Sequence, residues 1–430
     1  MNTQQRIVRR IGATLSQSQH AAARLALVLF VSACQPVMPV AEQQPAELSP
    51  GAPAYAVQGP HAVGYRSLVI GEGTDHPLAA GIWYPALNPA GAEEEITYDI
   101  QIKDATWAGD PHAVVYGHAL RDADMDAAAG PYPLVVLSHG FSLSAAAYSL
   151  TAEHYTSYGF VVLAPDHKEQ FDPTWEDEWT SAIDRPRDAK QALDYAEELT
   201  APGGAMAGLI DMQHVAVVGH SSGGYTALAM AGAQFDLEAY NARCARLPAD
   251  DWHSAFLCTP FVPREAEMAA RAGLDPMPVG LWPSFGDPRV TAIIPMAGSS
   301  YLFGPKGLSN ITIPMMAIGG SADTGTPYDW GTKPSYDYAA SEQKALVTLT
   351  GAEHMIFVTP CENQPWMSNH PAAPYFCADA VWDKDHALDL IHHFSTAFLL
   401  DTLKGDPAAH AALLPDAVDF SGIEYATTLQ

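Results

Sequence analysis

Short, uninterrupted hydrophobic runs recur along this chain, and longer stretches with helical periodicity separate them. Strands buried on both faces of a parallel sheet are hydrophobic at every position, whereas strands with one solvated face alternate between hydrophobic and polar residues. The runs therefore predict a mostly parallel central sheet. The expected strands are residues 65–70, 78–84, 134–137, 161–164, 215–218, 290–296, 315–318 and 345–349.

The stretches between these runs predict helices. Hydrophobic and small residues at spacings of three and four indicate helices at about residues 144–158, 184–199, 222–234 and 385–400. In the second of these helices, Asp184 is expected to cap the N-terminus and Pro186 to lie in the first turn. Strands that alternate with helices predict an α/β fold in which helices cover both faces of the sheet.

One buried run leads directly into a candidate nucleophile. Residues 219–223 read Gly-His-Ser-Ser-Gly and match the pattern G-x-S-x-G between a strand and a helix. A sharp turn there exposes the serine at its tip, and glycines leave room for the neighbouring backbone. We therefore predict that Ser221 is the nucleophile of a hydrolase. The alternative is a tight structural turn whose serine has no catalytic role.

A serine hydroxyl needs a base and an acid that orients the base, and the ends of later strands supply both. Asp323 follows the strand expected at residues 315–318, and His354 follows the strand expected at residues 345–349. The order serine, aspartate, histidine along the chain is that of the α/β-hydrolases. We predict that His354 is the general base and that Asp323 orients it.

Other acids and histidines are weaker candidates for these roles. Asp329 is the reserve acid. His370, His386 and His393 lie in an insertion or on the last expected helix rather than directly after a strand.

Two backbone N–H groups are expected to bind the developing oxyanion. One belongs to Ser222, the residue after the nucleophile, and the other to Phe141 in the loop that follows the strand at residues 134–137. Losing one such donor typically costs about 10²–10³ in rate. His139, in the same loop, is expected to be structural.

Four segments together resemble one group of esterases. They are residues 83–85 (Trp-Tyr-Pro), 135–141 (VVLSHGF), 185–188 (Arg-Pro-Arg-Asp) and 219–224 (GHSSGG). The chain is similar in these segments to platelet-activating-factor acetylhydrolase and the dienelactone hydrolases. The resemblance implies an α/β-hydrolase fold with inserted, lid-like segments and no cofactor. It also implies hydrolysis of esters with short or modest acyl groups, including phospholipid-like or lactone esters. Dienelactone hydrolases usually carry a nucleophilic cysteine, so Ser221 favours the esterases.

Two other functions stay open at this stage. An amidase or peptidase of the same fold would use the same three residues, because the triad does not distinguish an ester from an amide. A non-catalytic binding lipoprotein that kept the fold is the second alternative. The natural substrate and the oligomeric state are not encoded in any recognisable motif.

The N-terminal segment is typical of an export signal. Residues 1–33 contain four arginines, no acidic residue and the short apolar run at residues 25–31, which is too short to span a membrane. Small residues precede Cys34, as in the lipobox of bacterial lipoproteins, and this resemblance implies cleavage before Cys34 and lipidation of its thiol. The expected location is the bacterial cell envelope, in the periplasm or on the cell surface. A secreted protein with an incidental cysteine is the alternative.

The remaining chain divides into a tether and one catalytic domain. Residues 34–60 are rich in Pro, Ala, Glu and Gln and predict a disordered tether. Residues 61–430 form the α/β-hydrolase domain, with insertions at about residues 85–130, 235–288 and 355–380. In an exported protein the four cysteines of this domain predict the disulfides Cys244–Cys258 and Cys361–Cys377, because each pair brackets one insertion. Zinc is the alternative, but the spacing of a zinc site is missing.

Charge narrows the range of partners. The chain of 430 residues has 49 acidic and 21 basic side chains and a formal net charge of −28. Such a charge repels phosphate backbones and anionic membranes, so we expect no nucleic-acid partner and no membrane attachment except through a lipid on Cys34. The expected partner is a small-molecule or lipid ester.

Overall fold

The fold is built on a ten-stranded sheet with the strand order β12-β11-β10-β9-β8-β6-β7-β2-β1-β5. This is a computed structural model, and it describes residues 53–100, 113–167, 178–248, 251, 253–368 and 370–430. The six strands from β7 to β11 in this order run parallel to one another. Strand β2 pairs antiparallel with β7 and with β1, and β12 pairs antiparallel with β11, while β1 pairs parallel with β5. The strands are β1 (Ala62–Ile70), β2 (Leu78–Ala86), β5 (Leu120–Arg121), β6 (Tyr132–Ser138), β7 (Val161–Pro165), β8 (Ile210–His220), β9 (Ala292–Met296), β10 (Met315–Gly320), β11 (Lys344–Leu349) and β12 (Ile423–Thr427).

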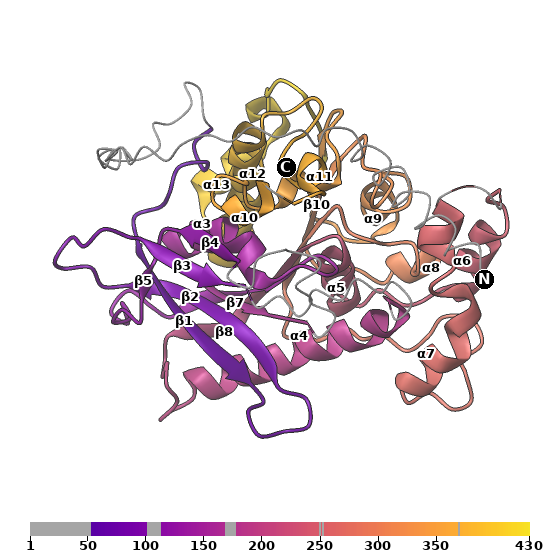
Figure 1. The fold of residues 1–430 in the computed structure, drawn as a ribbon, viewed down its shortest axis with the longest axis horizontal. Helices are drawn as coiled ribbons and strands as arrows, with labels where there is room; N and C mark the ends of the chain where they lie inside the picture. The colour runs from indigo at the N-terminus through magenta and orange to yellow at the C-terminus, as the bar shows by residue number, and fades with distance from the viewer. Residues whose placement is uncertain (1–52, 101–112, 168–177, 249–250, 252, 369) are drawn as a thin grey trace, which may run out of the picture. The chain divides into compact units, whose positions relative to one another are not determined.

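Two hydrophobic cores lie on opposite faces of this sheet. In β6, Val135 and Leu137 belong to one core, and Leu134 and Val136 belong to the other. This alternation explains why the central strands are hydrophobic at every position. The first core is covered by α3 (Ser149–Ser157), α12 (Lys384–Lys404) and α13 (Pro407–Ala412), and the second by α4 (Glu178–Thr200), α5 (Ser222–Met230) and α8 (Gly304–Leu308). Figure 1 shows α3 and α12 on one side of the strands and α4 on the other.

Helix α4 begins earlier than the sequence suggests. It starts at Glu178, so Asp184 is not its cap and Pro186 lies inside the helix rather than in its first turn. A proline cannot donate to the carbonyl four residues before it, here that of Ala182. The hydroxyl of Tyr225 in α5 donates to the Ala182 carbonyl instead. The helix tolerates its proline because a neighbouring helix satisfies the carbonyl that the proline leaves without a helical donor.

The first predicted insertion, residues 85–130, is more regular than expected. In it, β3 (Ile96–Asp99) pairs with β4 (Val114–Gly117) as a separate two-stranded sheet, and β5 adds to the edge of the main sheet. The buried Tyr98 of β3 accepts a hydrogen bond from the Trp83 indole and donates one to Glu153. These contacts hold the small sheet against the main one.

Short helices make up the other two insertions, and a disulfide closes a loop in each. Residues 235–288 contain α6 (Leu237–Cys244), η3 (Ser254–Cys258), η4 (Val262–Arg264) and α7 (Glu265–Arg271). Residues 355–380 include most of η5 (His354–Phe357), then α10 (Pro365–Ser368) and α11 (Ala373–Phe376). The structure contains both expected disulfides, Cys244–Cys258 and Cys361–Cys377.

Most of the N-terminal predictions concern residues outside the described range. The signal segment, Cys34 and most of the expected tether lie before residue 53. Among the described residues, none of the helices combines the length and the hydrophobicity that a membrane span requires.

Candidate active site

Ser221 occupies a strained turn between β8 and α5. Its backbone has φ +58° and ψ −117°, a conformation that a residue with a side chain rarely adopts. Such strain costs about 1–3 kcal/mol and persists only where the surroundings hold it. The N–H of Ser221 donates to the Met296 carbonyl, and its own carbonyl accepts from the N–H groups of Tyr225 and Ser299.

Glycines allow this turn to approach the neighbouring loop. A Cβ on Gly223 would lie 1.9 Å from the Ser138 carbonyl oxygen, and one on Gly219 would lie 2.7 Å from the same atom. A Cβ on Gly224 would lie 2.5 Å from the Gly298 Cα. No side chain fits at these positions, which is the steric reason for the glycines of the motif.

The fold brings Ser221, His354 and Asp323 into one hydrogen-bonded chain. His354 Nε2 lies 2.9 Å from Ser221 Oγ, and His354 Nδ1 lies 2.8 Å from Asp323 Oδ2. His354 begins η5 shortly after β11, and Asp323 follows β10, so each residue comes from the C-terminal end of a strand. The side chains of His354 and Asp323 are 8% and 1% exposed.

The hydrogen bonds of this chain define its proton positions. Asp323 accepts at Oδ1 from the N–H of Thr326 and at Oδ2 from Nδ1–H of His354. The neutral imidazole then presents Nε2 as an acceptor for the Ser221 hydroxyl. This is the protonation pattern that a general base for Ser221 requires.

A second network connects the loop after β6 to the backbone of His354. His220 faces the His354 carbonyl with Nε2 at 2.9 Å, so Nε2 carries the proton. Burial and the neighbouring His354 lower the pKa of His220 well below its ordinary value, so the ring is neutral and its Nδ1 accepts from the Tyr148 hydroxyl at 2.7 Å. The Tyr148 oxygen in turn accepts from the N–H of Gly140 at 3.2 Å.

The two expected oxyanion donors are sequence neighbours of residues in these networks. Phe141 follows Gly140 directly, and Ser222, the first residue of α5, follows Ser221. The Gly140 N–H is already bonded to Tyr148, so it is not the donor from this loop. His139 is buried; it donates from Nδ1 to the Gly140 carbonyl and accepts at Nε2 from the N–H of His167. These are structural contacts, in keeping with the role expected for it.

The reserve candidates do not join the Ser221 chain. The backbone carbonyl of Asp329 binds Arg243, while the carboxylate that His354 contacts belongs to Asp323. His393 accepts from the N–H of Tyr55, and His386 stacks on Trp382. The ring of His370 accepts from the N–H of Ala372.

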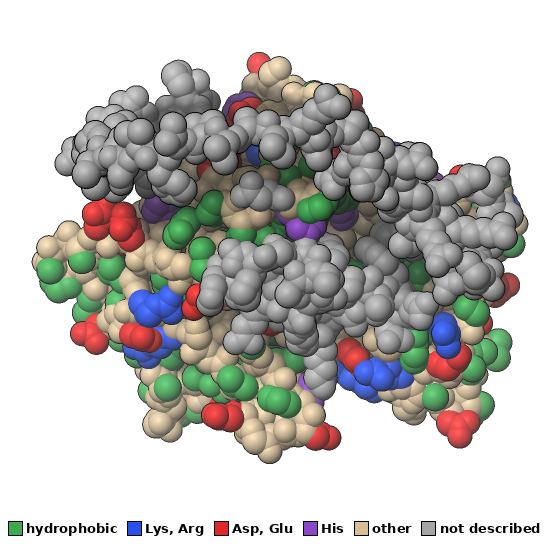
Figure 2. All heavy atoms as spheres, in the orientation of Figure 1, with side chains coloured by type: hydrophobic (Ala, Val, Ile, Leu, Met, Phe, Trp, Pro, Cys, Tyr) green, Lys and Arg blue, Asp and Glu red, His purple; other side chains and the backbone are tan. Residues whose placement is uncertain are grey.

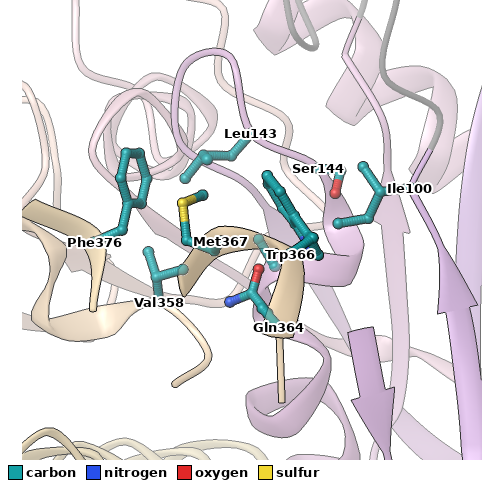
Figure 3. A pocket seen from close by; sticks show the side chains of 9 residues that line it. Ile100, Leu143, Ser144, Val358, Gln364, Trp366, Met367 and Phe376 are labelled. Atoms are coloured by element: carbon teal, nitrogen blue, oxygen red, sulfur yellow. The ribbon is translucent and has the colours of Figure 1, made fainter. Parts of the chain in front are cut away.

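A small apolar pocket lies between the loop after β6 and the insertion after His354. Figure 3 shows Leu143 and Ser144 on one side of it and Val358, Trp366, Met367 and Phe376 on the other, with their side chains directed toward a common space. The last three of these residues lie within the segment that Cys361–Cys377 closes. A second pocket has a more polar lining, including Glu178, Ser181, Ser222, Ser299 and Tyr301.

Figure 2 shows how side chains of different kinds are distributed on one face of the molecule. On the face drawn in Figure 2, histidine and hydrophobic side chains lie next to each other near the centre, and acidic side chains are spread toward the edge. Within the described part of the chain, His, Cys, Asp and Glu side chains form no group of three that could hold a metal ion.

Sequence reasoning assigned no role in the site to four buried polar residues that lie near it. They are Tyr148, His167, Arg185 and Asp188, each no more than 1% exposed. Arg185 and Asp188 were visible in the sequence as charges on the apolar stripe of a helix, the same face as Ala189 and Ala192. A charge on a buried face needs a partner, and that is the signal that could have pointed to them.

The strand order and the serine turn between β8 and α5 define an α/β-hydrolase fold. Residues 124–245 match the family described as Chlorophyllase. Among curated proteins the chain is similar to Cutinase est2 of Thermobifida alba, with 28% identity over 193 residues, which is 44% of this chain and 58% of the relative. It is also similar to Cutinase est1 of the same organism, with 24% identity over 224 residues, 52% of this chain and 53% of the relative.

The matched regions cover only part of each protein. The chain spans little more than half the length of these curated relatives. The family match includes Ser221 and the loop after β6 but ends before Asp323 and His354.

Proposed function

We propose that this protein is a serine hydrolase of carboxylic esters. The observation that carries the proposal is the hydrogen-bonded chain from Ser221 through His354 to Asp323, at 2.9 and 2.8 Å, at a strained strand-to-helix turn. The similarity to cutinases supports an ester rather than an amide as substrate.

The proposed mechanism has two steps. Ser221 Oγ attacks the ester carbonyl carbon as its proton passes to His354 Nε2, and that proton then leaves with the alcohol. Water next attacks the acyl-enzyme, gives a proton to His354, and releases the acid while Ser221 recovers its proton. Asp323 holds the imidazole in the correct tautomer and stabilises its charged form. The N–H groups of Phe141 and Ser222 are proposed to bind the oxyanion in both steps.

The proposed acyl site is the apolar pocket of Figure 3. Its lining includes Leu143, two residues after Phe141, and Val358, four residues after His354, so segments that follow both parts of the site border it. Its small size favours short or modest acyl groups. The more polar second pocket, which includes Ser222, is the proposed site of the alcohol group.

We propose that the enzyme acts outside the cytoplasm. Two disulfides are typical of exported proteins. Cleavage before Cys34 and attachment through a lipid on that residue, in the periplasm or on the cell surface, are part of this proposal.

A panel of p-nitrophenyl esters from acetate to palmitate tests the activity, with the anilide of the best acyl group as the amide comparison. The wild type is expected to hydrolyse short esters fastest and the anilide far more slowly. Ser221→Ala is expected to lose turnover, and full activity in this variant would refute the proposal. Faster cleavage of the anilide than of the ester would indicate an amidase.

The acyl site has its own test. Opening Cys361–Cys377 with the pair Cys361→Ser and Cys377→Ser removes a loop constraint worth about 3 kcal/mol and loosens three pocket residues. The preference among acyl chains is expected to broaden toward longer ones. The disulfide Cys244–Cys258 closes a loop of similar length that supplies no residue to this pocket, so opening it with Cys244→Ser and Cys258→Ser serves as the control. If the variant without Cys361–Cys377 keeps the wild-type preference among acyl chains, the acyl group binds elsewhere.

A further inference from the structure

A second Ser–His–Asp chain lies buried behind the loop after β6. His167 Nε2 lies 2.9 Å from Ser138 Oγ, and His167 Nδ1 lies 2.8 Å from Asp188 Oδ2. These distances are the same as those in the chain of Ser221. The three residues are each 1% exposed, so Ser138 has no access to a substrate.

Arg185 connects this buried chain to the loop. One terminal nitrogen of its guanidinium, Nη1, donates to Ser138 Oγ at 3.4 Å and to the His139 carbonyl at 2.5 Å, and the other, Nη2, donates to the Gly140 carbonyl at 3.2 Å. Arg185 is completely buried. A buried cation is costly unless it is hydrogen-bonded, and the two carbonyls and the hydroxyl offset part of that cost.

Asp188 is the anionic end of the buried chain. Burial alone would raise the pKa of Asp188, but hydrogen bonds and charge from His167 and His76 outweigh it and lower the pKa. The carboxylate is therefore ionised at neutral pH. His76 Nε2 lies 2.7 Å from its second oxygen and extends the chain to a partly exposed residue.

The orientation of the peptide units in the loop after β6 links Arg185 to the candidate active site. A trans peptide unit points its C=O and its N–H in opposite directions. In the unit between His139 and Gly140, the carbonyl faces Arg185 and the N–H faces Tyr148. Tyr148 leads through His220 to the His354 backbone, so the side opposite Arg185 is the side of the candidate triad.

The next peptide unit, between Gly140 and Phe141, has the same orientation, with its carbonyl toward Arg185. The Gly140 carbonyl accepts from Arg185 and from His139 Nδ1–H, so the N–H of Phe141, in the same unit, is directed away from Arg185. Two successive N–H groups on one side of a loop form a concave site for an anion. The Gly140 N–H is bonded to Tyr148, so of the two the Phe141 N–H is the one that the proposed mechanism assigns to the substrate oxygen.

We propose that Arg185 is a positioning residue for the oxyanion hole, and that the chain Ser138–His167–Asp188 holds its guanidinium in place. This rests on the proposed function, because it assigns the Phe141 N–H to an oxyanion. Arg185 acts through the loop and does not touch the substrate. The second Ser–His–Asp chain is thus a structural support, built like the first but without access to solvent.

Arg185→Lys is the main test, with Arg187→Lys as the matched control. A single ammonium group cannot bond both carbonyls in the directions that a guanidinium fork reaches. Arg187 lies on the same helix, but it is exposed and donates to the Arg271 carbonyl. The readouts are kcat and KM for a short ester and the inhibition constant of an alkyl trifluoromethyl ketone, whose adduct with Ser221 carries an oxyanion.

Arg185→Lys is expected to lower kcat by about 10²-fold and to leave KM within about threefold of wild type. The inhibition constant of the ketone is expected to rise by about the same factor as kcat falls. Arg187→Lys is expected to change none of these values. If Arg185→Lys does not fold, His167→Gln takes its place with the same pattern expected, because a glutamine cannot bond both Ser138 and Asp188.

Two results would overturn the inference while leaving the proposed function intact. One is an unchanged kcat and ketone affinity in Arg185→Lys, and the other is a loss of kcat without weaker ketone binding. Retained activity in Ser221→Ala would instead refute the proposed function, so the two failures are distinguishable.

Discussion

Tyr148 is expected to stabilise the loop after β6 from the side opposite Arg185. Its hydroxyl serves two buried groups at once, since it accepts from the Gly140 N–H and donates to His220 Nδ1. Burial raises the pKa of Tyr148, so the hydroxyl stays protonated at any pH of interest. The substitution Tyr148→Phe keeps the ring and removes only this oxygen.

The cost of Tyr148→Phe follows from the two groups left without a partner. Each buried polar group that loses its hydrogen bond costs about 1–3 kcal/mol, so the free energy of unfolding should fall by about 3 kcal/mol. The peptide unit between His139 and Gly140 also loses one of its two anchors, and kcat for a short ester should fall about tenfold.

Denaturant unfolding with intact disulfides measures the first quantity, and steady-state kinetics measure the second. Tyr132→Phe is the control, because its hydroxyl makes one bond, to the Asp126 carbonyl, at the other end of β6. It should cost about 1 kcal/mol and leave kcat unchanged. An unfolding free energy for Tyr148→Phe within about 0.5 kcal/mol of wild type would refute the reasoning.

Three further changes test other parts of the structure. Asp323→Asn should keep the fold by circular dichroism but lower kcat about 10⁴-fold, because an amide supports the wrong imidazole tautomer; a loss under tenfold would argue against its role. Gly223→Ala places a Cβ 1.9 Å from the Ser138 carbonyl oxygen, a backbone clash that no rotamer relieves, and should cost about 3 kcal/mol or more by thermal unfolding. Burial lowers the pKa of both His154 and His393 to about 4, from 6.5. Between pH 4 and pH 6.5 the unfolded chain therefore binds more protons than the folded protein. The free energy of unfolding should fall by about 2 kcal/mol per histidine from about pH 6.5 to pH 5. Buried His139, His220 and His392 add shares of their own, because their pKa values are also lowered. His154→Gln should therefore remove one histidine's share of the fall in denaturant unfolding, and an unchanged fall would contradict it.

The positions around Ser221 could be predicted because they depend on local signals. A buried hydrophobic run, a glycine motif and the start of a helix fix where Ser221 lies. Asp323 and His354 were found because the ends of parallel strands meet at one edge of a sheet, and the structure brings all three side chains into hydrogen-bond contact. Their catalytic roles stay predictions.

Other features depend on contacts between distant parts of the chain. The start of α4 was misjudged because Pro186 is tolerated only through the bond from Tyr225 to Ala182, which no local pattern reveals. The edge strand β12 was missed for a similar reason. Its residues alternate between half-buried and exposed, and the strand gains its order from pairing with β11.

The resemblance to platelet-activating-factor acetylhydrolase and dienelactone hydrolases stays a prediction. The comparisons point to the Chlorophyllase family and to cutinases, over residues that include Ser221. All of these share the α/β-hydrolase fold that the sheet order defines.

Covalent trapping tests the central claim most directly. The protein is treated with a fluorophosphonate, digested, and analysed by peptide mass spectrometry, with Ser221→Ala and heat-denatured wild type in parallel. We expect one equivalent of label on Ser221 in the folded wild type and none in either control. Label on another residue, or no label on folded protein that still hydrolyses esters, would contradict the account.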